Sequence, residues 1–217
     1  MIAQEILDIA SAEVHYHEKR SGTPVADLIP KTNAYDGSDN WTKYHYQLGI
    51  TQGLDWCGFF LYWCFSRLFN SYAETNTFLY NIINMGGGVD DWFDAFDNAG
   101  EFYYRGSAYT PKAGDVVLFS NNIYTYSHAE VVFDPANFGN GTIVTIGGNT
   151  TDPFDPGDQS RGMYVAQRVR DCAVGTGFRV LGYCNVPYDG TPSPGYLDDI
   201  TLFSLWFAKK KRRKTWY

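Results

Sequence analysis

The sequence predicts an α+β domain in which N-terminal helices pack on an antiparallel sheet of five to six strands. Two observations lead to this prediction. Up to about residue 100, apolar residues recur at helical spacing or form a run too long for a typical strand. Beyond Tyr104 the chain changes to short β-branched or alternating segments, separated by clusters of Asn, Gly, Asp and Pro. Helices followed by strands favour a helical layer packed on a sheet.

Four helices are expected in the N-terminal half. The first runs from Ile2 to about Val14 with apolar residues on one face. The other three are an apolar run without proline and two segments that end at glycines, and they cover 57–69, 75–84 and 89–100. The polar stretch 20–53 contains several turn motifs, so we expect an irregular segment that walls a cleft.

Five segments of the C-terminal half have the length and composition of strands. They are 115–119, 128–133, 141–148, 162–169 and 178–186. The turn residues between them predict an antiparallel meander. The chain contains no internal repeat.

The charge distribution argues against nucleic acid as a partner. All six residues of Lys209–Lys214 are basic, whereas the preceding chain holds 11 basic and 24 acidic residues. Because a phosphate backbone requires a positive face, we expect no nucleic-acid binding by the body of the protein. No apolar run reaches the roughly 18 residues of a membrane span.

Three regions are predicted along the chain. Residues 1–187 form the principal folded domain, 188–196 form a linker rich in Pro and Gly, and 197–217 form a short apolar and basic tail. The basic cluster Lys209–Lys214 is expected to contact an anionic wall polymer, a membrane surface or a partner protein, and a disordered tail is the alternative. We expect a monomer.

Two cysteines in GLDWCGFFLYWC have different surroundings. The N-terminus lacks the basic and apolar regions of a signal peptide, so a disulfide framework is not favoured. Thiolate is the reactive form of cysteine, and a helix N-terminus favours it. Cys57 stands where the helix begins, whereas Cys64 lies two turns inside, about 10 Å along the axis. We expect Cys64 to be inert packing, while position alone leaves Cys57 undecided.

A nucleophilic cysteine needs a base and a group that orients the base. Of the four histidines, His128 opens a predicted strand directly after a polar loop, where a general base is both fixed and accessible. The next strand ends at TIGGNT, which puts Asn149 at the edge of the same sheet. We expect His15, His17 and His45 to be structural or solvated.

The motifs DWCGFFLYWC, PKAGDVVLF, SHAEVVF and TIGGNT together resemble the CHAP family of cysteine, histidine-dependent amidohydrolases and peptidases, within the papain-like NlpC/P60 group. The resemblance covers roughly 1–187 and includes EVHYHEK and NWTKY. It implies a papain-like fold and cleavage of an amide bond in bacterial peptidoglycan, either between sugar and stem peptide or within the peptide. By motif, Cys57 would be the nucleophile, His128 the base and later the acid, and Asn149 the orienting residue.

Further residues follow from the same resemblance. The backbone N–H of Cys57 would contribute to an oxyanion hole. The candidates for contacts in the substrate cleft are Asp55, Trp56 and Tyr126. Acyl-enzyme formation and hydrolysis would follow without a cofactor.

The chain departs from the family pattern at two positions. Many members have a glutamate two residues before the asparagine, where this chain has Gly147. Many also have a small residue two after the histidine, where this chain has Glu130. Strand alternation puts Glu130 on the same face as His128, so it is a candidate auxiliary residue for catalysis, substrate contact or filling of the cleft.

Calcium is the one metal that the resemblance raises, because some members bind it before the cysteine. Asp36 and Asp39 in YDGSDN lack the spacing and closing glutamate of an EF-hand loop. An ordinary turn is therefore the favoured interpretation, and we expect no metal.

The leading hypothesis is a phage or prophage lysin, made in the host cytoplasm or mounted on a virion and acting on the bacterial wall. Two alternatives stay open. One is a catalytically degenerate wall-binding or virion structural module on the same scaffold, which Gly147 and Glu130 suggest. The other is a cytosolic cysteine peptidase or transglutaminase-like enzyme acting on proteins.

Overall fold

The computed structural model describes residues 2–69, 71–82, 87–120, 127–151, 162–172 and 179–188. The linker and tail expected from residue 188 onward therefore lie almost entirely outside the described residues. The helices are α1 (Ile2–Glu13), α2 (Val25–Leu28), α3 (Lys43–Leu48), α4 (Cys57–Ser66), α5 (Tyr72–Phe78), α7 (Val89–Ala99) and the 3-10 turn η1 (Phe138–Asn140). The strands are β1 (Phe102–Tyr104), β2 (Val116–Ser120), β3 (His128–Asp134), β4 (Thr142–Thr150), β5 (Tyr164–Asp171) and β6 (Arg179–Cys184).

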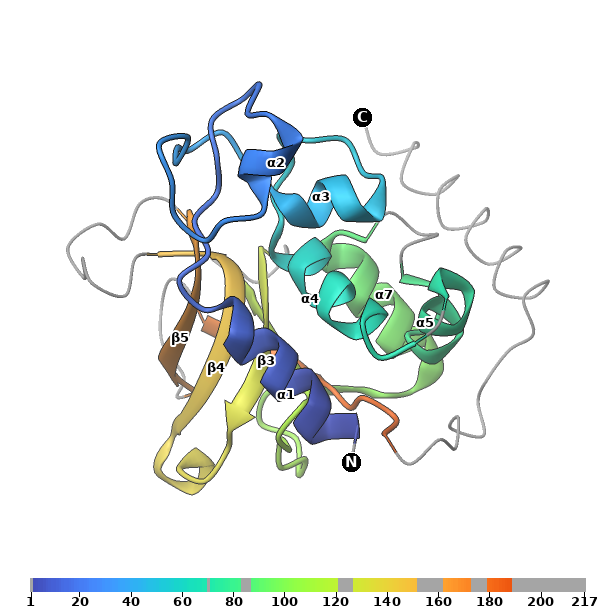
Figure 1. Ribbon diagram of the computed structural model, residues 1–217. Helices are drawn as coiled ribbons and strands as arrows, with labels where there is room; N and C mark the ends of the chain where they lie inside the picture. The colour runs from blue at the N-terminus through green and yellow to red at the C-terminus, as the bar shows by residue number, and fades with distance from the viewer. Residues whose placement is uncertain are drawn as a thin grey trace, which may run out of the picture.

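The described strands form one antiparallel sheet in the order β1-β6-β2-β3-β4-β5. This confirms the predicted α+β class, with helices packed against the sheet (Figure 1). The meander prediction holds from β2 to β5. It is wrong for β6, which returns to pair with β2, and the three-residue edge strand β1 was not expected.

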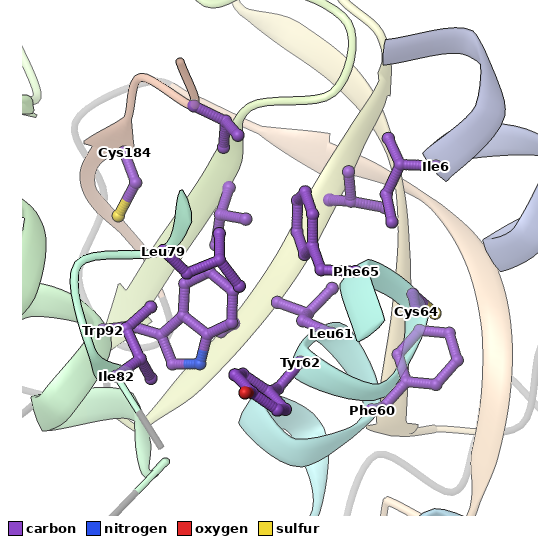
Figure 2. Close-up of a cluster of buried hydrophobic side chains, with 14 of the residues drawn as sticks. Ile6, Phe60, Leu61, Tyr62, Cys64, Phe65, Leu79, Ile82, Trp92 and Cys184 are labelled. Carbon is purple, nitrogen blue, oxygen red and sulfur yellow. The ribbon is translucent and has the colours of Figure 1, made fainter. Parts of the chain in front are cut away.

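Helix α4 is the centre of the core. Nine consecutive residues from Cys57 to Phe65 are buried, so the helix is apolar on every side. It contacts β3 and β4 on one side and α1, α3, α5 and α7 on the others. Figure 2 shows side chains of α4 beside those of Ile6 of α1 and Trp92 of α7, all members of one buried cluster. A helix that is hydrophobic all round requires such enclosure, which fixes its ends relative to the sheet.

The helices differ from expectation at three places, the first of which is α2, a single turn inside the stretch 20–53 that was predicted to be irregular. Helix α5 begins after Ser71, whose hydroxyl caps Glu74, and it ends at Phe78 rather than at the glycine run. Helix α3 forms inside the stretch predicted to be irregular, because Thr42 accepts a cap hydrogen bond and Gly49 ends the helix in the left-handed conformation.

No helix of the described ranges has the length and hydropathy needed to cross a bilayer. All four cysteines are free thiols.

Candidate active site

Cys57 is the first residue of α4. The preceding residue is a tryptophan, whose side chain cannot accept a hydrogen bond and so leaves the first-turn N–H groups uncapped. Cys57 itself is 3% exposed. The thiol therefore stands at the positive end of the helix, beside backbone donors that are available to an oxyanion.

His128 is the first residue of β3 and lies against this cysteine. The Cys57 side chain is within hydrogen-bonding reach of the imidazole, and the Nε2–H of His128 donates to Glu130 Oε1 at 2.9 Å. Burial alone would lower the pKa of His128. Hydrogen bonding and charge interaction with Cys57, and then with Glu130, outweigh burial and raise this pKa to about 9. At neutral pH the imidazole is therefore protonated.

Glu130 lies two residues along β3, with its side chain fully buried. Arg170 of β5 donates to both carboxylate oxygens, through Nε to Oε2 at 2.8 Å and through Nη2 to Oε1. The strand alternation that put Glu130 beside His128 is confirmed by their hydrogen bond. Arg170 was not anticipated, because its position depends on the pairing of β5 with β4 and no local motif marks it.

Asn149 lies near the end of β4, where the register with β5 shifts. Its backbone is left-handed, with φ of 53°, which asparagine tolerates better than most residues. Its side-chain Nδ2 donates to Asp55 Oδ1 at 3.3 Å. The structure thus brings Asn149 into contact with Asp55, which lies two positions before Cys57 in the sequence. Asp55 is exposed, as expected of a cleft residue.

Trp56 and Tyr126 complete the predicted set. Trp56 is fully buried, stacks on Tyr44 and donates from its indole Nε1 to Glu18 Oε2 at 2.7 Å. It therefore supports the start of α4 from within the core and does not line a cleft, contrary to expectation. Tyr126 lies outside the described residues.

Other cysteines and histidines differ from the Cys57–His128 pair. Burial raises the pKa of Cys64 well above its usual value, consistent with inert packing. Burial lowers the pKa of His45 to about 4, so this side chain is neutral at pH 7. The His17 ring donates from Nδ1 to the carbonyl oxygen of Glu18 at 2.6 Å and lies edge-on to the ring of Tyr164, as expected for a structural histidine.

The aspartates considered for calcium are engaged by the chain itself. Asp36 Oδ1 forms an ion pair with Lys19 Nζ at 2.5 Å, and Asp39 Oδ2 accepts from the backbone N–H of Ser21 at 2.8 Å. The part of the chain that the structure describes holds no cluster of three His, Cys, Asp or Glu residues arranged for a metal.

Comparison with known proteins identifies one family. The family model described as the CHAP domain matches residues 49–149. This segment begins just before α4 and ends at Asn149, so it contains Cys57, His128 and Glu130. No curated protein and no solved structure matches the chain.

Proposed function

Because residues 49–149 are a CHAP domain, a cysteine- and histidine-dependent amidohydrolase and peptidase domain, we propose that this protein hydrolyses an amide bond of bacterial peptidoglycan with Cys57 and His128. The observation that supports the proposal best is the contact between the thiol at the start of α4 and the imidazole at the start of β3. Peptidoglycan is the substrate on which CHAP domains act.

The arrangement supports a two-step reaction. The Cys57 sulfur attacks the amide carbonyl carbon, and the oxyanion that forms accepts hydrogen bonds from backbone N–H groups at the start of α4. The His128 imidazolium then gives its proton to the departing amine as the C–N bond breaks. This leaves a thioester on Cys57 and a neutral imidazole.

Hydrolysis of the thioester restores the site. Neutral His128 accepts a proton from a water molecule that attacks the thioester carbonyl. The carbonyl–sulfur bond breaks, the carboxylic acid product leaves, and the proton on the imidazole recreates the resting pair. We infer that Asp55 and Asn149, which are joined by a hydrogen bond, contact the peptide part of the substrate.

The finer assignments belong to the same proposal. We infer that the enzyme is a lysin of phage or prophage type, and that Lys209–Lys214 contacts an anionic wall polymer, a membrane surface or a partner protein. Whether the bond cut joins sugar to peptide or lies within the peptide is decided by the products.

The test uses purified peptidoglycan from several wall types. We expect the native protein to clear the suspension and release new amino groups, and Cys57→Ala and His128→Ala to release none. Cys64→Ala is the matched control, since it removes a thiol from the same helix without touching His128. Mass analysis of the fragments identifies the bond. Equal inactivity of the native protein and Cys57→Ala on every wall type would overturn the proposal, and retained wall binding would then favour the non-catalytic alternative.

A further inference from the structure

A buried carboxylate lies directly behind the histidine of the site. Glu130 Oε1 accepts from His128 Nε2 at 2.9 Å, and the same imidazole also interacts with the Cys57 side chain. Both residues belong to β3 and are separated by one position, so strand alternation directs them to the same face. This is the position of a residue that orients a catalytic imidazole.

Three donors hold this carboxylate in place. Besides His128, the Arg170 guanidinium binds both oxygens, and the Thr145 hydroxyl donates to Oε2 at 2.5 Å. Burial would raise the pKa of Glu130. Arg170 first, and then His128, outweigh burial and hold this pKa well below its usual range. The carboxylate is therefore charged at neutral pH.

The neighbouring strand leaves room for this side chain. A Cβ atom at Gly147 of β4 would lie 2.5 Å from Glu130 Cγ and 2.9 Å from Oε1, closer than real Cβ contacts allow. The Glu130 carboxylate thus fills the space that a side chain at position 147 would enter. The conformation of Glu130 therefore requires a residue without a side chain at position 147.

We propose that Glu130 is the positioning residue for His128, and that Gly147 and Arg170 are present to accommodate and hold its carboxylate. The inference rests on the proposed function, because His128 must be the acid and base of the reaction. It assigns to Glu130 the orienting role that sequence resemblance gave to Asn149, whose recorded side-chain partner is Asp55.

Two further charged or titratable groups flank the His128–Glu130 pair within the part of the chain that the structure describes. Cys57 of α4 faces the imidazole, and Arg170 of β5 faces the carboxylate. Removing the charge of Glu130 therefore removes a carboxylate that favours the imidazolium form of His128. It should weaken proton retention on His128 without altering Cys57 directly.

The first test is Glu130→Gln, measured as kcat/KM on peptidoglycan across pH. We expect a loss of at least about tenfold and a shift of the alkaline limb of the pH profile to lower pH, because a neutral amide stabilises imidazolium less than a carboxylate does. Thr145→Val is the matched control. It removes one hydrogen bond from the same carboxylate but leaves the bond to His128, so it should lower stability and leave the alkaline limb in place.

The second test moves the carboxylate to the other strand. Glu130→Ala should lose activity, and adding Gly147→Glu should restore at least about tenfold of it, because the new side chain enters the space that Glu130 vacated. Gly147→Glu alone should impair the protein, since two carboxylates would compete for that space. Circular dichroism identifies any variant that fails to fold, and the double variant keeps the inference testable if Glu130→Gln is one of them.

The outcomes separate this inference from the proposed function. If the native protein is active, Cys57→Ala is inactive and Glu130→Gln keeps the native rate and pH profile, the inference fails and the function stands. If the native protein is inactive, the function fails. The inference is then judged from iodoacetamide alkylation of Cys57 against pH, with Cys57→Ala as the blank. Alkylation reports the thiolate, and a less stable imidazolium stabilises the thiolate less. A shift of the profile to higher pH in Glu130→Gln therefore supports the inference, and a profile that is unshifted or moves to lower pH overturns it.

Discussion

The indole Nε1 of Trp56 donates a 2.7 Å hydrogen bond to the carboxylate of Glu18, which lies 38 residues earlier in the chain. Both side chains are almost fully buried. The other carboxylate oxygen of Glu18 accepts from the backbone N–H of Asn40 at 3.1 Å. This single carboxylate therefore ties the segment before α3 to Trp56, the residue that precedes Cys57.

Trp56→Phe should lower both stability and the rate of hydrolysis. The change leaves a buried carboxylate oxygen without its donor, which costs about 1–3 kcal/mol, and it loosens the residue next to Cys57. Urea denaturation measures the free energy of unfolding, and wall clearance per folded molecule measures the rate.

Trp63→Phe is the matched control on the same helix. Its Nε1 donates at 2.7 Å to the neutral amide oxygen of Gln47, far from Cys57. We expect a smaller loss of stability and an unchanged rate. Equal effects of the two substitutions on the rate would contradict a role for Trp56 in holding the nucleophile.

The sequence was sufficient to predict the elements whose signals are local. The run from Cys57 to Phe65 is continuously apolar, and the strands β2 to β5 are β-branched between turn residues, so their types follow from composition. The placement of β6 beside β2 and the edge strand β1 depend on contacts between distant segments, which periodicity does not encode.

The same division applies to the site. Cys57 and His128 were predictable because a helix start and a strand start are local features. The Glu130 contact followed from alternation along one strand. Arg170 and Glu18 were not predictable, because their partners are distant in the sequence. Arg170 bonds to Glu130, which lies 40 positions earlier, and Glu18 bonds to Trp56, which lies 38 positions later.

Gly148→Ala should destabilise the protein. A Cβ at this position would lie 2.6 Å from the Trp56 ring and 2.7 Å from Phe60 Cβ, so α4 would have to move away from β4. Overpacking of this kind costs about 1–3 kcal/mol. Gly139→Ala is the control, because a Cβ there meets nothing within 4 Å. Thermal unfolding that ranks the two variants equally would contradict this account of the contact between α4 and β4.

The His128–Glu130 pair should make stability depend on pH on both sides of a plateau. The pKa of His128 is raised from 6.5 to about 9 on folding, so its contribution is complete below 6.5 and is lost as the pH rises through about 9. The pKa of Glu130 is lowered from 4.5, so its contribution is present above 4.5 and is lost as the pH falls.

We therefore expect this pair to stabilise the fold most between pH 4.5 and 6.5. Urea denaturation at several pH values measures the free energy of unfolding. In His128→Asn the fall in stability on the alkaline side should become shallower, since the group that loses its proton is gone. An alkaline slope that is identical in the native protein and the variant would show that His128 does not carry the raised pKa.

Chelation of divalent cations should leave the hydrolysis rate unchanged. Asp36 is paired with the Lys19 ammonium and Asp39 is bonded to the backbone of Ser21, so neither carboxylate is directed toward a shared cation. Calcium prefers six to eight oxygen ligands, and an ammonium in contact with one of the candidates opposes its binding. Wall clearance measured in EDTA and then with added calcium chloride tests this expectation. A loss of rate in EDTA that calcium reverses, and that Asp36→Asn abolishes, would show that the Lys19–Asp36 pair opens to form a cation site.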